Sequence, residues 1–295
     1  MTTEGSNADG GGKSGAEIST GVERKNHEST EEVSLTPEVE VRGFVGAGGV
    51  VGMRWFDEPY KLSAGLAGWR CEGDPPQDEE LSVQMLIAET ELDAFQDMME
   101  PYTFVRLRCR LERAQNRRMY AIATEISHLE NDDEELEQLR VKAQLPVTMN
   151  DPVLGEFVLD RRRNTFEGTI SWGGEIATLK LSSDSTKAAL GMLATAKELL
   201  KDQQTWDTKV KACAVEHLLE LKNTVWQDDD DDDEGSEAEA VTAEEFAGRM
   251  KLNSVSIDKR GAFQFWYDDG DLFFGHAIEV SGNLRTGVKR ADIAG

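Results

Sequence analysis

The segment FQFWYDDGDLFFGH, residues 263–276, has the pattern of a β-hairpin. Every second residue before the aspartates is aromatic, which is typical of a strand with one buried face. These aromatic residues are Phe263, Phe265 and Tyr267. Asp269 and Gly270 then predict a type I′ turn, because both residue types adopt positive φ at low cost. We therefore expect two antiparallel strands here, near residues 261–267 and 272–280.

The same segment contains the candidate catalytic residues. Asp268 and Asp271 are expected to face each other across the turn, where two close carboxylates repel, raise one pKa or attract a cation. Together with His276 they form a candidate site for a metal-assisted hydrolase. The simpler interpretation, which we favour, has the aspartates solvated at the turn and His276 packed against an aromatic ring, with no catalytic task and no metal ligand.

Residues upstream of this hairpin predict an antiparallel sheet with helices. A meander is expected with strands at 155–160, 165–172 and 175–181 and turns at Arg163-Asn164 and Gly173-Gly174. Two helices should follow, the second from about 206 to 226. The acidic stretch 228–240 predicts an extended, solvated loop, because like charges repel. Thr242 and Glu245 form a possible capping box for a third, short helix.

Three segments of this half resemble a family of uncharacterised bacterial domains of unknown function. They are NDPVLGEFVLDRRRNTFEGTISWGG, LLELKNTVW and the tail LNSVSIDKRGAFQFWYDDGDLFFGHAIEVSGNLRTGVKRADIAG. The resemblance covers residues 149–295, and the acidic stretch is an insertion relative to it. It implies a bacterial, soluble α+β domain and brings no activity and no site residues.

The preceding region, residues 38–146, predicts a mainly antiparallel β domain, as a curved sheet or partial barrel, ending in a charged helix at 131–145. The glycines of GAGG, residues 46–49, suggest a hairpin turn between two strands. Arginines alternate outward along the strand near residue 107 and give a candidate single-stranded nucleic-acid surface. The leading members are Arg106, Arg108 and Arg110, followed by Arg113, Arg117 and Arg118. Alternatively, these arginines pair with the protein's own carboxylates, which we favour.

Residues 1–37 are rich in Gly, Ser, Thr and Glu and predict a disordered tail, because they bury too little apolar surface to offset ordering entropy. Pro146 and Pro152 mark a domain boundary. The fold class is therefore α+β with two domains. The first is the mainly β domain at 38–146, and the second, at 149–295, is an antiparallel sheet packed with two to three helices.

The net charge of −25 and the pI of about 4.5 disfavour nucleic acid and anionic membranes as partners. No apolar run is long enough to span a bilayer, and the N-terminus has no signal-peptide core. The three cysteines form no CxxC pair. We therefore expect a cytoplasmic protein without a cofactor. No H-E-x-x-H or G-x-S-x-G motif occurs. We therefore expect a non-enzymatic bacterial accessory protein, toxin-neutralising or regulatory, with a basic protein partner. The alternatives are the hydrolase and the nucleic-acid binder.

Overall fold

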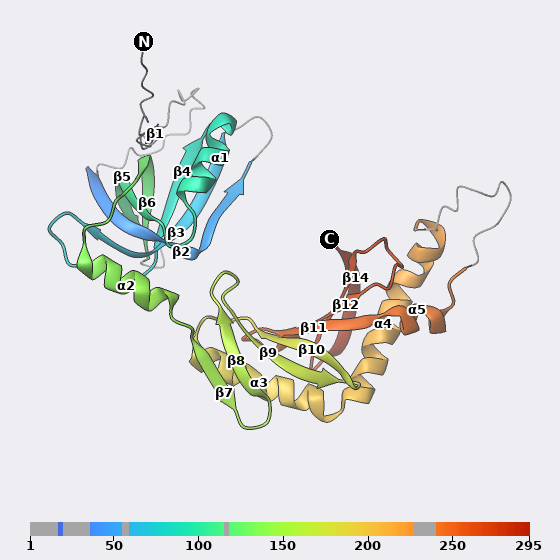
Figure 1. Cartoon of the computed structure of the whole chain (residues 1–295). Helices are drawn as coiled ribbons and strands as arrows, with labels where there is room; N and C mark the ends of the chain where they lie inside the picture. Colours follow the sequence, from blue (N-terminus) through green and yellow to red (C-terminus); the bar gives the residue numbers. More distant parts are fainter. Residues whose placement is uncertain (1–16, 20–35, 55–58, 115–117, 227–239) are drawn as a thin grey trace, which may run out of the picture. The chain divides into compact units, whose positions relative to one another are not determined.

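A computed structural model of the chain (Figure 1) describes residues 17–19, 36–54, 59–114, 118–226 and 240–295. The chain divides into two compact units, Met1–Leu145 and Pro146–Gly295, which we call the barrel unit and the sheet unit. Within the predicted disordered tail, Glu17–Ser19 form the short strand β1, and the remainder up to residue 35 lies outside the described residues. The predicted acidic loop also lies outside them, except for Ala240.

The barrel unit contains five long strands that close into a barrel. The strands are β2 (Glu38–Met53), β3 (Tyr60–Cys71), β4 (Leu81–Ile87), β5 (Phe104–Arg113) and β6 (Met119–His128). They pair in the order β2-β3-β4-β6-β5, and β5 pairs back with β2. β1 adds to β6 in antiparallel register. The predicted mainly antiparallel, curved or barrel-like sheet is therefore confirmed.

One pair in this barrel, β4 with β6, is parallel. Between the two strands lie η1 (Glu89–Glu91), the helix α1 (Leu92–Met98) and β5, and a connection of this length is what parallel pairing requires. A five-stranded barrel with a helix between its third and fourth strands resembles the OB-fold. The hairpin expected at GAGG is wrong: β2 continues through these glycines, and its register with β3 shifts between Val45 and Val50.

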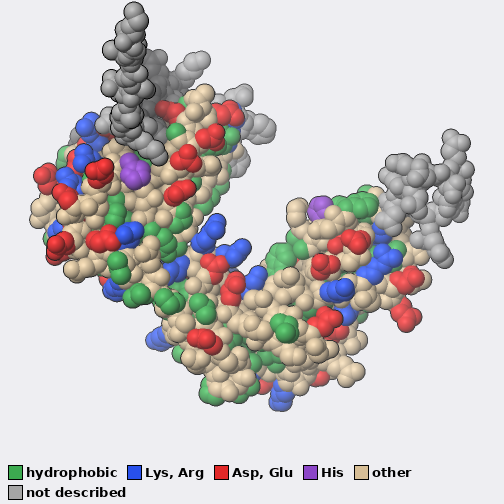
Figure 2. Space-filling model, in the orientation of Figure 1, with side chains coloured by type: hydrophobic (Ala, Val, Ile, Leu, Met, Phe, Trp, Pro, Cys, Tyr) green, Lys and Arg blue, Asp and Glu red, His purple; other side chains and the backbone are tan. Residues whose placement is uncertain are grey.

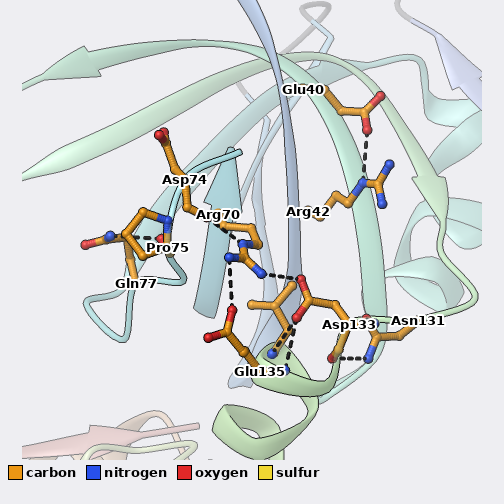
Figure 3. Close-up of polar contacts among 10 residues, drawn as sticks. Glu40, Arg42, Arg70, Asp74, Pro75, Gln77, Asn131, Asp133 and Glu135 are labelled. Carbon is orange, nitrogen blue, oxygen red and sulfur yellow. Dashed lines mark hydrogen bonds and ion pairs between the residues drawn. The ribbon is translucent and has the colours of Figure 1, made fainter. Parts of the chain in front are cut away.

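The charged helix α2 (Glu134–Gln144) closes one end of the barrel (Figure 1). Its buried Leu136 packs in a small apolar cluster with Phe44 and Phe104. Asp133 caps the helix by accepting from the Glu135 and Leu136 amides, both at 3.1 Å. Arg70 of β3 approaches the same carboxylate with Nη1 at 2.7 Å from Oδ2 (Figure 3). The helix is thus held by apolar contacts, a cap and an ion pair together.

The sheet unit contains eight strands in sequence order, β7 to β14. They are β7 (Thr148–Asp151), β8 (Gly155–Asp160), β9 (Thr165–Trp172), β10 (Glu175–Leu181), β11 (Lys251–Ile257), β12 (Ala262–Asp268), β13 (Ala277–Asn283) and β14 (Gly287–Ala294). The predicted meander is confirmed, with β8, β9 and β10 at the expected residues. All neighbours are antiparallel except β10 and β11.

Three helices connect β10 to β11, and this long crossover lets the two strands run in the same direction. They are α3 (Thr186–Lys201), α4 (Gln203–Thr224) and α5 (Ala243–Arg249). The predicted capping box is present, since the Thr242 side chain accepts from the Glu245 amide and Glu245 accepts from the Thr242 amide. Among the described residues, no helix is long and apolar enough to cross a membrane.

The helices α3 and α4 lie on one side of this sheet (Figure 1). Side chains along its strands accordingly alternate between the buried, helix-covered side and the opposite side. Phe263, Phe265 and Tyr267 are buried in the core that these helices share with the strands. The ring of Phe265 lies 5.1 Å from that of Trp172 in edge-to-face geometry. Burial of each such side chain contributes roughly 2 kcal/mol. The intervening residues of β12 face the opposite side, which we call the open face.

Candidate functional site

The connection between β12 and β13, residues 269–276, is the most unusual backbone segment of the sheet unit. The predicted two-residue turn is wrong here. Asp268 pairs with Ala277, so the connection has eight residues. Positive φ falls on Gly270 (58°) and Asp271 (64°), one residue later than expected. Asp268 and Asp271 therefore do not face each other across a turn.

Asp269 explains this backbone path. It is 2% exposed. Its Oδ2 accepts from the Phe273 amide at 2.5 Å and the Gly275 amide at 3.2 Å, and its Oδ1 accepts from the Asp271 amide at 3.3 Å. Hydrogen bonds to an ionised acceptor are stronger than neutral ones, and a buried carboxylate needs such partners. One side chain thus organises the whole connection.

Phe274 lies between two of the amides that Asp269 binds. It adopts φ of 55°, and its side chain is 62% exposed. A bulky residue in this left-handed region costs about 1–3 kcal/mol. The connection therefore holds an exposed aromatic ring in a strained conformation, at the expense of stability.

Phe274 belongs to a group that we call the aromatic surface. It consists of the exposed residues Val225 and Phe274 and the half-buried residues Trp226 and His276. The Trp226 ring lies 5.5 Å from the Phe274 ring and 5.2 Å from the His276 ring. Val225 is 69% exposed. Buried Lys222 fixes the end of α4, because its Nζ donates to the Trp226 carbonyl oxygen at 2.6 Å. In the sequence, the aspartate run begins two residues after Trp226.

A groove of about 560 Å³ lies on the open face beside this connection. Its lining includes Lys180, Ser254, Gln264, Trp266, Asp268 and His276. Asp268 and His276 thus come together in one concavity as the hydrolase hypothesis requires, whereas Asp271 is absent from the lining. We call this concavity the open-face groove.

The groove holds only part of the predicted catalytic set. Asp268 Oδ1 accepts from the Gly270 amide at 2.9 Å. His276 donates from Nδ1 to the Phe273 carbonyl oxygen at 2.8 Å, and its ring packs against Trp226. Within the described parts of the chain, no three His, Cys, Asp or Glu side chains are grouped to hold a metal ion. Both side chains therefore have structural contacts that need no reaction to explain them.

The arginine strand β5 lies in the barrel unit, beside the glutamates of β2 and β6. Arg106 Nε is 3.7 Å from Glu40 Oε1, and Arg108 Nη1 is 3.1 Å from Glu125 Oε2. Arg110 has a buried Nε without a hydrogen-bond partner. Acidic and basic side chains intermingle on the visible face of this unit (Figure 2). The pairing of Arg106 and Arg108 with the protein's own carboxylates follows the favoured interpretation.

These arginines also lie away from the strands that OB-fold barrels use for oligonucleotides. That surface is formed by the second and third barrel strands, here β3 and β4. Its outward side chains include Lys61, Ser63, Ser82, Gln84 and Leu86, and its second basic residue, Arg70, is paired with Asp133. The described side chains of β3 and β4 therefore form no concentrated basic patch, but OB-folds also use the loop between the fourth and fifth strands, which here carries Arg118 and includes residues 115–117, outside the described residues.

Sequence reasoning missed the two residues that define the aromatic surface, Phe274 and Trp226, and the role of Asp269. The available signal was the position of Trp226 directly before the acidic run and the pair Phe273-Phe274 before a glycine. Alternation alone does not distinguish the three aspartates, because it does not show which of them has a buried side chain.

Comparisons with known proteins match both units to families without a known function. Residues 151–293 match the family described as "Uncharacterized protein conserved in bacteria (DUF2262)", and residues 26–143 match "Domain of unknown function (DUF7021)". No curated protein matches the chain. Among solved structures, a murine DNA-binding protein bound to double-stranded DNA is 11% identical, covering 50% of this chain and 76% of that one. Its TM-score is 0.21, too low to support any argument about this protein.

Proposed function

We propose that this protein is a non-enzymatic accessory protein. It belongs to the DUF2262 family by its sheet unit and to the DUF7021 family by its barrel unit. It acts in the bacterial cytoplasm and binds a basic protein partner at the aromatic surface. By binding this partner, the protein neutralises a toxin or regulates the partner's activity.

The observation that supports this proposal is the exposed side chain of Phe274, which is held on a backbone with positive φ. The backbone around it has four residues with positive φ between positions 270 and 275. A protein that needed only a chain reversal here could use a short turn without strain. Strained backbone is concentrated at functional sites, and aromatic side chains are the usual anchors of protein interfaces.

The charge of the adjacent sequence supports a basic partner. Residues 228–239 contain six aspartates and three glutamates, and they follow the aromatic surface directly in the chain. Such a charge concentration accelerates encounter with a cationic partner and disfavours anionic ones. Arginine or lysine side chains also bind tryptophan rings through cation–π contacts, each contributing about 0.5–1 kcal/mol at exposed sites.

The test is selection from a random displayed peptide library against the full chain. We expect enrichment of peptides that combine Lys or Arg with an apolar anchor, with affinity that falls as salt rises. Phe274→Ala should weaken these peptides by at least about tenfold, which corresponds to 1.4 kcal/mol. The matched control is Val153→Ala, because Val153 is 75% exposed but lies in the turn between β7 and β8, at one edge of the sheet.

Two results would contradict the proposal: enriched peptides without basic residues, or equal binding by Phe274→Ala and the unmodified chain. The hydrolase alternative is supported only by Asp268 and His276 sharing the groove. The nucleic-acid alternative is supported only by the OB-like strand order of the barrel. Neither alternative is supported by a feature comparable to Phe274, an exposed aromatic side chain on a backbone with positive φ.

A further inference from the structure

Four connections of the sheet unit leave its strands at the same end. Leu181, the last residue of β10, pairs with Phe166 near the start of β9 and with Ile257, the last residue of β11. Asn283, the last residue of β13, pairs with Ala262, the first residue of β12. We call these connections, together with the last residue of β8 and the first two residues of α3, the basic end. Its residues are 160–164, 182–187, 258–261 and 284–286.

The charge of the basic end is opposite to that of the whole chain. It contains seven Lys and Arg residues and three Asp residues, whereas the chain has 32 basic and 57 acidic residues. Arg163, Lys259 and Arg260 line one hollow of about 620 Å³, and Asp184 and Asp258 line it as well. A positive region on an otherwise negative molecule favours an anionic partner.

Two of the three aspartates are occupied by the backbone of their own turns. Asp160 Oδ1 accepts from the Arg162 and Arg163 amides at 2.8 and 3.2 Å, and its Oδ2 accepts from Arg163 Nη1 at 2.8 Å. Asp258 Oδ1 accepts from the Arg260 amide at 2.8 Å. Four exposed basic side chains of the turns form no ion pair with another described residue: Arg162, Lys259, Arg260 and Arg285. These four cations are available to a partner.

The opposite end of the same strands is acidic. β12 runs from Ala262 at the basic end to Asp268, a distance of about 20 Å at 3.3 Å per residue. The connection after Asp268 contains two more aspartates, and the ring of its Phe273 lies 5.6 Å from the Trp226 ring. The acidic run, residues 228–239, begins two residues after Trp226. The sheet unit thus carries opposite charges at the two ends of its strands.

The acidic run cannot lie along the basic end of its own chain. Asn223 donates to the Val241 carbonyl oxygen at 3.0 Å and accepts from the Val241 amide at 2.9 Å, which holds the two ends of the intervening segment close together. The thirteen residues 227–239 can therefore extend outward by about seven residues, or roughly 24 Å at most. Only the middle of the segment could reach the nearest turn, which is about 20 Å away.

A second copy of the chain can place its acidic run along the whole basic end. From the β8–β9 turn to the β13–β14 turn, the basic end spans five strand spacings, or about 24 Å. Six extended aspartates cover about 20 Å. The length of the run and the length of the basic end are therefore similar.

We infer that the acidic run of one copy of this chain docks on the basic end of a second copy. The aspartates pair with the exposed cations of the turns, among them Arg162, Lys259 and Arg260. The contact joins two different surfaces, so the copies associate head to tail. It uses neither Phe274 nor the open-face groove, and it does not depend on the partner of the aromatic surface.

Sedimentation velocity of the full chain measures this association. An ionic strength of about 0.1 M gives a Debye length of about 10 Å, which screens repulsion between the net charges of two copies more than contacts between neighbouring side chains. We expect association that rises with protein concentration. It should weaken by at least about tenfold at about 1 M, where the Debye length is about 3 Å.

Two variants separate the acidic run from the basic end. The basic-end variant combines Arg162→Gln, Lys259→Gln and Arg260→Gln, and the run variant changes the six aspartates 228–233 to asparagine. Each variant alone should associate at least about tenfold more weakly than the unmodified chain. A mixture of the two should form a one-to-one complex with the affinity of the unmodified contact, because one variant supplies an intact run and the other an intact basic end.

The matched control combines Lys142→Gln, Lys201→Gln and Lys251→Gln, which change the net charge by the same amount as the basic-end variant. All three lysines are exposed and lie outside the basic end. The control should associate like the unmodified chain, and circular dichroism verifies the fold of every variant.

A chain that stays monomeric at millimolar concentration would overturn the inference, as would a mixture of the two variants that does not associate. Equal weakening by the control would show an effect of net charge alone and would also overturn it. If a short oligothymidylate binds the unmodified chain, and the basic-end variant loses this binding but still self-associates, the basic end serves nucleic acid and the inference is wrong. Phe274→Ala should self-associate normally, so failure of this inference and failure of the proposed function are distinguishable.

Discussion

Asp133 in the barrel unit and Asp269 in the sheet unit both hold a turn of the chain, but they do so with different partners. Asp133 accepts from two amides at a helix start and from Arg70 at 2.7 Å. Asp269 accepts only from backbone amides, three of them. The first carboxylate supports a helix that also packs through Leu136. The second supports eight residues without regular structure, so the conformation of this connection depends more strongly on its single carboxylate.

The largest expected effect comes from removing the carboxylate that acts alone. Asp269→Ala leaves the Asp271, Phe273 and Gly275 amides without their acceptor, and the unfolding free energy should fall by about 3 kcal/mol. Urea denaturation measures this change. Asp269→Asn keeps one acceptor oxygen and should lose less. A loss below about 1 kcal/mol for the alanine variant would show that the connection holds without Asp269, and the comparison would fail.

A smaller effect is expected from the pH dependence of Asp133. Burial by itself raises the pKa of this carboxyl, but the hydrogen bond from Arg70 and those from the Leu136 and Glu135 amides outweigh it, so the pKa lies below its usual value. A lowered folded-state pKa contributes stability above the unfolded value of about 3.9, and this contribution is lost as pH falls through the folded value.

Unfolding free energies measured between pH 6 and pH 2 test this expectation. Asp133→Asn cannot titrate at this position, so its acid-induced loss should be smaller than that of the unmodified chain by about 1 kcal/mol. All other carboxyls are common to both proteins and cancel in the difference. Coinciding pH profiles would mean that the Arg70 pair does not favour ionised Asp133.

The smallest expected effect on stability is at Phe274. Asparagine adopts the left-handed region more readily than phenylalanine, which should regain about 0.5–1 kcal/mol of strain. Loss of the ring contact with Trp226 should remove a similar amount. Phe274→Asn should therefore leave the unfolding free energy within about 0.5 kcal/mol of the unmodified value while weakening the selected basic peptides. A loss of 2 kcal/mol or more would mark Phe274 as a structural residue.

The strands and turns of the first meander were predictable from the sequence because their signals are local. Asn164, Gly173 and Gly174 adopt the positive φ that their turns require, with values of 52°, 61° and 92°. Alternation between those turns determines which side chains are buried. The capping box at Thr242 and the charged helix α2 were predictable for the same reason, since each depends on residues within one turn of the helix.

The candidate site was predictable only in its position. Asp268 and His276 do line one groove, but the sequence placed Asp271 with them and treated Asp269 as solvated. Which of the three aspartates at 268, 269 and 271 is buried depends on where the amides of residues 271–275 point. Their direction follows from packing of Phe273 against Trp226 and Phe246. These contacts join residues far apart in the chain.

The sequence by itself therefore determined the α+β class, the meander and the capped start of α5, because neighbouring residues decide turns, alternation and caps. Only the tertiary structure decided the parallel pair β10–β11, which glutamates pair with Arg106 and Arg108, and the groove across β10, β11 and β12. Each of these depends on which distant strands become neighbours, and that is selected by burial of the whole core rather than by any local pattern.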